Sequence, residues 1–391
     1  MWGVIRTGAG EENRTPVVSL GSFCSAIELR PLIFNKTFKP IAYKFPRGHK
    51  KTLLATPLVC RNEADHSTRI LQNLTMKNTL KTEYFDNKFV NPKYTVEGEP
   101  RAQVTLSALR TLWFNTGTIC NLTCTNCFMD SSPVNDQLSF LKLHEVETFL
   151  NEIEDRSLPT REIGFTGGEP FINPDLMSML ELCLEKKFRV LVLTNAMKPM
   201  MKNASELVGL RHRFPDNLVV RVSIDHHDKK KHEMERGIGT WETAINGLIW
   251  LSNQHFECRV AGRRPALETE EQSRRGYTKL FSKHRIHVNA EDPKQLVLFP
   301  EIDSSQPAQE LSTTCLSTLN VERSHLMCSN SRMVIRRKNT NKPTVVACTL
   351  ITQDQHFELG ANLAGSNKTI ALNHPFCAQF CVLGGATCSN G

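Results

Sequence analysis

From about residue 111 onward, short apolar runs alternate with longer segments in which apolar residues recur every three or four positions. The short runs have the length of β-strands and occupy residues 112–118, 161–166, 189–194, 217–224, 256–261 and 296–299. The longer segments predict amphipathic helices at residues 143–154, 175–187, 198–209, 241–253 and 269–283. Uninterrupted apolar strands suit a parallel sheet that is covered on both faces. The pattern therefore predicts an α/β fold, a partial (β/α)6 barrel whose ligands gather at the carboxyl ends of its strands.

The segment before this repeat differs from it in charge. Residues 1–110 contain 17 Lys and Arg against 9 Asp and Glu, whereas residues 111–391 contain 31 of each. The net charge of +8 therefore resides in the leading segment, and no basic stripe in the remainder indicates a nucleic-acid partner. We expect four parts: a basic leader at 1–75, an N-terminal segment at 76–110, the barrel at 111–300 and a cysteine-rich extension at 301–391.

The leader shows neither helix nor strand periodicity, and residues 8–20 read like the translation of a transfer-RNA gene. It is interpreted as a mispredicted start, with Met76 as the true initiator, or as a disordered basic tail. Mass spectrometry of the native N-terminus would decide between these two interpretations.

The composition bears on the cellular compartment. No run approaches the roughly 18 apolar residues of a membrane helix, and no compact apolar segment indicates a secretory signal. We therefore expect a cytoplasmic protein without a membrane partner, in a compartment that keeps thiols reduced. The 13 cysteines accordingly indicate metal ligands, catalytic groups and core residues rather than disulfides.

Three cysteines follow the first predicted strand within eight residues. They are Cys120, Cys124 and Cys127. A Cys-x3-Cys-x2-Cys loop lets three thiolates surround one small cluster, whereas zinc sites usually take their pairs from two separate segments. Three ligands leave one iron of a 4Fe–4S cluster open for a substrate or cofactor. A zinc knuckle is the alternative.

A second motif ends the next predicted strand. Its residues are Gly167, Gly168, Glu169 and Pro170. Paired glycines let the backbone approach a ligand closely, and a glutamate offers a carboxylate to an ammonium group. The alternative is a plain turn before a helix that is capped by Asn173 or Asp175.

The two motifs together resemble the radical S-adenosylmethionine (radical SAM) enzymes over residues 111 to about 300. The resemblance implies that the three cysteines hold a 4Fe–4S cluster whose fourth iron is chelated by S-adenosylmethionine. It further implies that Gly167, Gly168, Glu169 and Pro170 contact the methionyl amine. One position departs from the family, because Asn126 precedes the third cysteine where an aromatic residue is usual, and Phe128 follows it.

Polar residues also end the later strands of the predicted barrel. By position and by resemblance, Ser223 and Asp225 are candidates for the ribose hydroxyls, Asn195 for the ligand or substrate, and Arg263 for the S-adenosylmethionine carboxylate. Each of them is equally explained as a turn former or a helix cap. Three histidines lie among lysines at 226–232 and are interpreted as a solvated loop. Cys183 and Cys258 are expected to be core thiols.

Six further cysteines fall in the last quarter of the chain. This cysteine-rich segment resembles the C-terminal extensions of SPASM or twitch type that many radical SAM enzymes carry. The resemblance implies an auxiliary 4Fe–4S cluster. The first-choice ligands are Cys348, Cys377, Cys381 and Cys388, with structural zinc as the alternative metal. Cys315 and Cys328 are possible replacements, and His374 is interpreted as a turn residue.

The resulting functional hypothesis is an enzyme that cleaves S-adenosylmethionine reductively and abstracts hydrogen from a substrate through the 5′-deoxyadenosyl radical. The expected partners are a peptide or small-molecule substrate and a one-electron reductant such as flavodoxin or ferredoxin. A peptide or protein side chain is the leading substrate class and a small metabolite is the rival. A non-catalytic iron–sulfur or zinc protein on the same scaffold is the alternative.

Overall fold

The computed structural model describes residues 88–302 and 307–385, so the predictions for the leader, Met76 and Cys388 lie outside the described residues. Six parallel strands run through the first described range. They are β2 (Thr111–Asn115), β3 (Glu162–Thr166), β4 (Arg189–Thr194), β5 (Leu218–Ser223), β6 (Glu257–Arg264) and β7 (Leu296–Pro300). Each pairs in parallel with the next along the chain.

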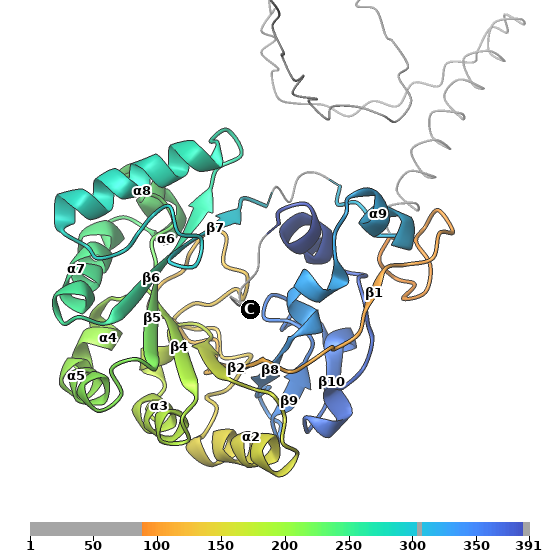
Figure 1. The fold of residues 1–391 in the computed structure, drawn as a ribbon, viewed down its shortest axis with the longest axis horizontal. Coiled ribbons are helices and arrows are strands. Elements are labelled where there is room, and N and C mark those ends of the chain that lie inside the picture. Colours follow the sequence, from red (N-terminus) through yellow and green to blue (C-terminus); the bar gives the residue numbers. More distant parts are fainter. Residues whose placement is uncertain (1–87, 303–306, 386–391) are drawn as a thin grey trace, which may run out of the picture. The chain divides into compact units, whose positions relative to one another are not determined.

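Helices cover the outer face of these strands (Figure 1). They are α2 (Leu143–Asp155), α3 (Leu176–Glu185), α4 (Lys198–Lys202), α5 (Ala204–Arg213), α6 (Lys229–Arg236), α7 (Thr240–Asn253) and α8 (Glu270–His284). The parallel pairing and the open sheet confirm the predicted partial (β/α)6 barrel. Within the described ranges, every helix is too short or too polar to cross a lipid bilayer.

Several predicted elements differ from those observed. The single helix predicted at 198–209 is divided into α4 and α5, because Asn203 (φ −100°, ψ 14°) leaves the helical conformation. The strand predicted to end at residue 261 continues to Arg264, where β6 still pairs with β7. β2 ends at Asn115, three residues early, because the Asn115 side chain accepts a hydrogen bond from the Gly117 N–H (2.9 Å) and turns the chain. The prediction of a solvated loop at 226–232 is wrong, because α6 begins there. Asp228 caps that helix by accepting from the Lys231 N–H (3.1 Å), and His232 is fully buried.

The sheet separates two hydrophobic cores. The outer core lies between the strands and the helices and includes the predicted core thiols Cys183 and Cys258. The inner core fills the barrel with side chains such as Trp113, Leu191 and Val219 and continues beneath the C-terminal extension. Barrel and extension therefore share one interior.

The extension continues the barrel sheet beyond β2. β8 (Ser331–Ile335) pairs in parallel with β2, and β9 (Thr344–Val346) and β10 (Glu358–Gly360) follow in antiparallel pairing. A small second sheet joins β1 (Gln103–Val104) to β11 (Ile370–Ala371). The helical elements described in the extension are α9 (Thr313–Thr318), a π-helical turn at Cys377–Val382, and short 3-10 turns at Arg323–His325, Met327–Ser329, Gln355–Phe357 and Ala364–Ser366. Because β8 lies beside β2, the extension adjoins the cysteine loop that follows β2.

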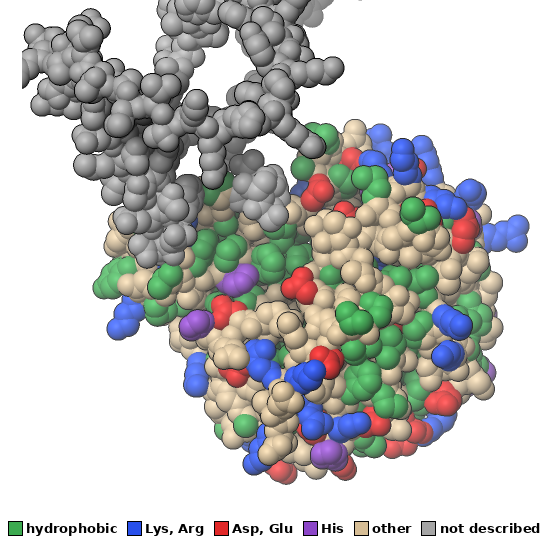
Figure 2. All heavy atoms as spheres, turned by 180° about the vertical axis from the view of Figure 1, so that it is seen from behind, with side chains coloured by type: hydrophobic (Ala, Val, Ile, Leu, Met, Phe, Trp, Pro, Cys, Tyr) green, Lys and Arg blue, Asp and Glu red, His purple; other side chains and the backbone are tan. Residues whose placement is uncertain are grey.

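Acidic and basic side chains lie intermingled on the face of the molecule in Figure 2. Several form exposed ion pairs, for example Lys229 with Glu242 (3.0 Å) and Lys186 with Glu154 (2.7 Å). This mixed surface agrees with the balanced charge of residues 111–391.

Candidate functional site

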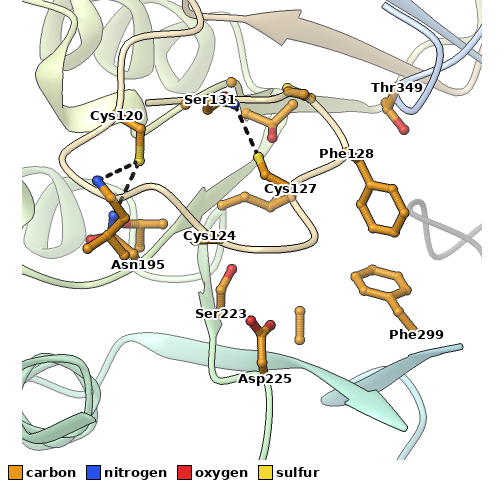
Figure 3. A pocket seen from close by; sticks show the side chains of 18 of the residues that line it. Cys120, Cys124, Cys127, Phe128, Ser131, Asn195, Ser223, Asp225, Phe299 and Thr349 are labelled. Carbon is orange, nitrogen blue, oxygen red and sulfur yellow. Dashed lines mark hydrogen bonds between the residues drawn. The ribbon is translucent and has the colours of Figure 1, made fainter. Parts of the chain in front are cut away.

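A pocket of about 1050 Å³, including its part open to solvent, lies at the carboxyl ends of the barrel strands (Figure 3). It is lined by nine residues that the sequence analysis selected: Cys120, Cys124, Cys127, Gly167, Gly168, Asn195, Ser223, Asp225 and Arg263. Glu169 and Pro170 lie outside the lining and are buried.

The cysteine loop is closed at its base, where the Cys120 N–H donates to the Ser132 carbonyl (3.1 Å). Within the loop, backbone N–H groups approach two of the sulfurs. Leu122 donates to Cys120 Sγ and Ser131 donates to Cys127 Sγ, both at 3.4 Å. Such donors favour the thiolate, which is the form that binds metal.

Burial raises the pKa of the Cys120 thiol to about 12 and also raises the pKa of Cys124, where Arg236 opposes the rise. The metal-free thiols are therefore protonated at neutral pH. Metal binding at this loop must release protons.

Two glycines hold the end of β3 against the cysteine loop. The Gly168 N–H donates to the Gly117 carbonyl (2.7 Å), and the Glu169 N–H donates to the Ile119 carbonyl (3.1 Å). A Cβ on Gly168 would lie 2.2 Å from the Ile119 oxygen, and one on Gly167, whose φ is +144°, would lie 2.6 Å from the Gly117 oxygen. Because neither position has room for a side chain, the glycine pair sets the distance between the two motifs.

The Glu169 carboxylate joins the ends of β3 and β4. It accepts hydrogen bonds from Thr194 Oγ1 and the Asn195 N–H, both at 2.8 Å, and from the Phe171 N–H at 3.3 Å. Burial raises the pKa of Glu169 to about 7. In this arrangement the Glu169 carboxylate holds the ends of β3 and β4 together. A ligand amine that binds this carboxylate would have to do so alongside the three donors already present.

Asn195 and Ser223 face the pocket from the ends of β4 and β5 (Figure 3). The Asn195 amide donates to Asn121 Oδ1 (2.9 Å) and lies 4.0 Å from Cys120 Sγ. It therefore connects the cysteine loop to β4.

Arg236 on α6 lines the same pocket and was missed by the sequence analysis. Its guanidinium binds both carboxylate oxygens of Asp225 (2.9 and 3.2 Å), and Arg263 Nε lies 3.7 Å from the same carboxylate. Burial alone would raise the pKa of Asp225, but the two arginines hold it below its usual value. The cap Asp228 and the terminal Gly237 are the start and stop signals by which this helix could have been found.

The tip of the cysteine loop is held by α6. The Thr125 N–H donates to the Glu235 carbonyl (2.8 Å) and Thr125 Oγ1 to the Met234 carbonyl (3.2 Å). Asn126 Nδ2 donates to both carboxylate oxygens of Glu235 (3.1 and 2.9 Å). The unusual Asn126 thus fastens the loop at the surface, and Phe128 supplies an aromatic ring to the pocket.

Four cysteines of the extension line a second cavity with otherwise apolar walls. Three of the four are predicted first-choice ligands, Cys348, Cys377 and Cys381. The fourth is Cys328, which the sequence predicted as a possible replacement. Burial raises the pKa of Cys328 to about 11 and that of Cys377 to about 12. Four thiols with apolar neighbours form a donor set suited to an iron–sulfur cluster.

The remaining candidates of the extension lie elsewhere. Cys315 on α9 accepts a hydrogen bond from Ser312 Oγ (3.3 Å) and lines a different cavity. His374 accepts the Phe376 N–H at Nδ1 (3.1 Å) and lines a groove beside the cysteine loop.

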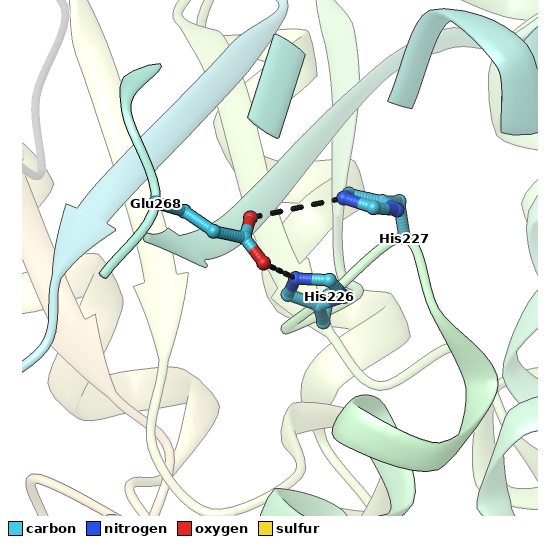
Figure 4. Close-up of side chains that lie close together, drawn as sticks. All are labelled: His226, His227 and Glu268. Atoms are coloured by element: carbon cyan, nitrogen blue, oxygen red, sulfur yellow. Dashed lines mark hydrogen bonds and ion pairs between the residues drawn. The ribbon is translucent and has the colours of Figure 1, made fainter. Parts of the chain in front are cut away.

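His226, His227 and Glu268 form a compact cluster near the end of β5 (Figure 4). The Asp228 N–H donates to His226 Nδ1 (2.9 Å), so we assign the proton to Nε2, which donates to Glu268 (3.0 Å). Lys231 also pairs with Glu268. Because these ligand atoms are already engaged, the cluster is a hydrogen-bond network that joins the end of β5 to the loop before α8.

The separation of the sulfurs distinguishes a single ion from a cluster. A tetrahedral zinc ion holds its sulfur ligands about 3.8 Å apart. In the described part of the chain, the histidine–glutamate cluster is the one group of three metal-type ligands whose atoms lie within 4.8 Å of one another. A 4Fe–4S cluster binds each thiolate on a different iron and requires wider spacing. In the described residues, neither cysteine set therefore brings three sulfurs within 4.8 Å of one another.

Comparison with known proteins adds independent information. Residues 114–272 match the family model described as the Radical SAM superfamily. The chain is 29% identical over 143 residues to the antilisterial bacteriocin subtilosin biosynthesis protein AlbA of Bacillus subtilis (strain 168), which covers 36% of this chain and 30% of that protein. It is 26% identical over 137 residues to the mycofactocin maturase MftC of Mycolicibacterium smegmatis, an alignment that covers 35% of this chain and 33% of that protein. The chain thus spans about a third of the length of these relatives.

Among solved structures, Streptococcus suis SuiB bound to S-adenosylmethionine aligns with a TM-score of 0.47 and 14% identity over 77% of this chain and 70% of that chain. The family model starts in β2, spans both cofactor motifs and ends in α8. Within it lie the three-cysteine loop and the Gly-Gly-Glu-Pro strand end that meet beside one pocket. Residues 114–272 are therefore similar to the radical SAM superfamily, whose members use a 4Fe–4S cluster and S-adenosylmethionine.

Proposed function

We propose that the protein is a radical SAM enzyme that cleaves S-adenosylmethionine reductively and abstracts hydrogen from a substrate. The observation that carries this proposal is the meeting of Cys120, Cys124 and Cys127 with Gly167 and Gly168 at one pocket. When bound, the cluster and S-adenosylmethionine supply the electron and the 5′-deoxyadenosyl radical.

The residues of the pocket fit both cofactors. Three thiols on one loop leave the fourth iron of a 4Fe–4S cluster without a protein ligand. The glycine pair lets the end of β3 pack directly against the backbone of the cysteine loop, which brings the two motifs together. We assign Gly167, Gly168, Glu169 and Pro170 to the side of the methionyl amine, with Glu169 positioning the strand ends.

The polar strand ends would orient S-adenosylmethionine. Ser223 and Asp225 are assigned to the ribose hydroxyls and Asn195 to the cofactor or substrate. Arg263 and the newly found Arg236 are assigned to the cofactor carboxylate, because both are cations at the pocket wall. The pairing of Arg236 with Asp225 holds both side chains in place before a ligand arrives.

The extension is proposed to hold an auxiliary 4Fe–4S cluster of SPASM or twitch type. Its ligands would be Cys348, Cys377 and Cys381, with Cys328 as the fourth because it lines the same cavity. Cys388 is the competing fourth ligand. An auxiliary cluster would bind substrate or accept an electron from a product radical.

A peptide or protein side chain is the proposed substrate. Two relatives support it by name, one a bacteriocin biosynthesis protein and the other a maturase. A small metabolite is the rival substrate, and a non-catalytic iron–sulfur or zinc protein on the same scaffold is the alternative function. A flavodoxin or ferredoxin would supply the electron, and the cytoplasm is the proposed compartment.

Cleavage of S-adenosylmethionine tests the function directly. Anaerobically reconstituted protein with dithionite should form 5′-deoxyadenosine and methionine. Cys124→Ala should abolish both products, whereas Cys258→Ala, in the outer core away from the pocket, should retain them. An intact cluster that yields neither product would support the non-catalytic alternative.

Iron and sulfide counts test the auxiliary site. The wild type should contain about eight irons, and a Cys120/Cys124/Cys127 triple alanine variant about four. Cys328→Ala should lower the count of that triple variant further, with Cys315→Ala as the matched control. If Cys388→Ala lowers it and Cys328→Ala does not, Cys388 is the fourth ligand.

A further inference from the structure

The pocket has two chemically different ends (Figure 3). One end carries the cysteines, the glycine pair and the polar strand ends. The other is walled by Phe128 of the cysteine loop, Leu193 of β4, Phe299 of β7, and Leu350 and Phe380 of the extension. Since the first end is filled by the cofactors of the proposed function, the second is left for the substrate.

The charged side chains of the pocket are Asp225, Arg236 and Arg263. Asp225 pairs with both arginines, and the proposed function leaves their remaining charge to the cofactor carboxylate. Arg263 also lies over the Phe128 ring, 5.1 Å from its centroid. A charged substrate group at the apolar end would lose its hydration without gaining a partner among the described lining residues. A cation would in addition be repelled by Arg263.

The aromatic walls support one another. The Phe380 ring contacts Phe128 edge to face (5.6 Å, 86°) and Phe299 at a tilt (5.2 Å, 39°). The extension thus supplies the back wall of the apolar end. An uncharged apolar or aromatic group is the complement of such a wall.

Two neutral polar groups in the same lining lack partners. They are Trp113 Nε1 and Ser131 Oγ, both buried and without a hydrogen bond among the described residues. Because these two atoms have almost no accessible surface, they offer a charged substrate group no hydrogen bond either.

A second groove adjoins the apolar end and shares Phe128, Arg263 and Leu350 with it. The rest of its lining combines polar side chains (Asn126, Asp130, Gln353, Asp354 and His374) with apolar ones (Ile302, Ile351 and Phe376). A substrate that spans both would place an apolar group in the pocket and a polar chain in the groove. A peptide has this character.

We infer that the substrate is a peptide whose reacting residue has an uncharged apolar or aromatic side chain, held between Phe128, Phe299 and Phe380. The inference rests on the proposed function and narrows its substrate class.

Calorimetry with defined peptides tests the inference without turnover. Protein loaded with cluster and S-adenosylmethionine, but given no reductant, is titrated with acetyl-Gly-Gly-Xaa-Gly-Gly-amide in which Xaa is Phe, Leu, Lys or Glu. We expect the Phe and Leu peptides to bind at least about tenfold more tightly than the Lys and Glu peptides. Equal affinities, or no binding by any of the four peptides, would overturn the inference.

Variants place a charge at the apolar end. Thr349→Asp, in the same lining, should raise the affinity for the Lys peptide and lower it for the Phe peptide. Leu350→Asp, at the next position of the same lining, is a second variant for which we expect the same two changes in affinity. Leu319→Asp, on a half-exposed leucine of the extension outside this pocket, should change neither affinity. Cleavage of S-adenosylmethionine without peptide is measured separately, so failure of the proposed function is distinguished from failure of this inference.

Discussion

Gly168 lies where the Gly-Gly-Glu-Pro strand end meets the cysteine loop. A methyl group added at this residue would push the two motifs apart. The Cβ of Gly168→Ala would lie 2.2 Å from the backbone oxygen of Ile119, which leads directly into the cysteine loop. We expect the variant to lose most of the iron of the first site and to keep that of the extension. Iron counts after gel filtration measure this.

Gly209→Ala on α5 is the matched control, because nothing lies within 4 Å of its Cβ. It should keep all its iron and gain about 0.5–1 kcal/mol of stability from helix propensity. Equal iron contents in the two variants would contradict the proposed role of the glycine pair.

His232 predicts a pH-dependent stability. It is fully buried against Trp241, and neither ring nitrogen has a hydrogen-bond partner in the part of the chain that the structure describes. Burial lowers its pKa to about 4. The unfolded chain, with a histidine pKa of about 6.5, binds more protons between pH 6.5 and 4, so stability falls as the pH falls through this range. Between pH 7 and pH 5 this residue should cost about 2 kcal/mol.

His232→Phe should remove this part of the pH dependence, whereas His212→Phe, at an exposed histidine of α5, should leave it unchanged. Urea unfolding at the two pH values measures the difference. The assignment fails if the wild type and His232→Phe lose equal stability on acidification.

Helix α6 is the element on which the site depends most, because it supplies Arg236 and fastens the cysteine loop. Glu235→Ala removes the two hydrogen bonds from Asn126 but keeps the backbone bond from Thr125. We expect iron release to a chelator to accelerate about fivefold, which corresponds to a loss of ~1 kcal/mol.

Glu233→Ala is the control on the same helix, because Glu233 bonds to the Gly239 N–H rather than to the loop. Release at the wild-type rate from both variants would show that the loop does not need this contact. Hydrophobic periodicity did not reveal α6, because the helix exposes four of its eight residues and fully buries only His232. Its capping residues, Asp228 and Gly237, are the sequence features that indicate this helix.

On the scale of the whole molecule, a buried ion pair joins the N-terminal segment to the extension. The side chains of Arg101 and Glu310 are 1% and 5% exposed, and Glu310 also accepts from the Phe89 and Val96 N–H groups, both at 2.6 Å. Glu310→Ala leaves Arg101 buried without its carboxylate. We expect a loss of about 3–5 kcal/mol in the free energy of unfolding.

Asp136→Ala breaks the ion pair between Asp136 and Lys338, in which both side chains are about half exposed, and should change the free energy of unfolding little. Chemical unfolding of both variants measures the contrast. Similar losses would contradict the view that the Arg101 pair holds the two segments together.

The sequence by itself determined the six βα units, the three-cysteine loop and the strand-end glycines. Each depends on residues close together along the chain, where periodicity and spacing directly reflect burial and turn geometry. Only the tertiary structure decided that β8 pairs with β2, that Cys328 lines the cavity of Cys348, and that Arg236 binds Asp225. These contacts join separate elements, and which elements meet is set by the packing of the whole chain rather than by any local pattern.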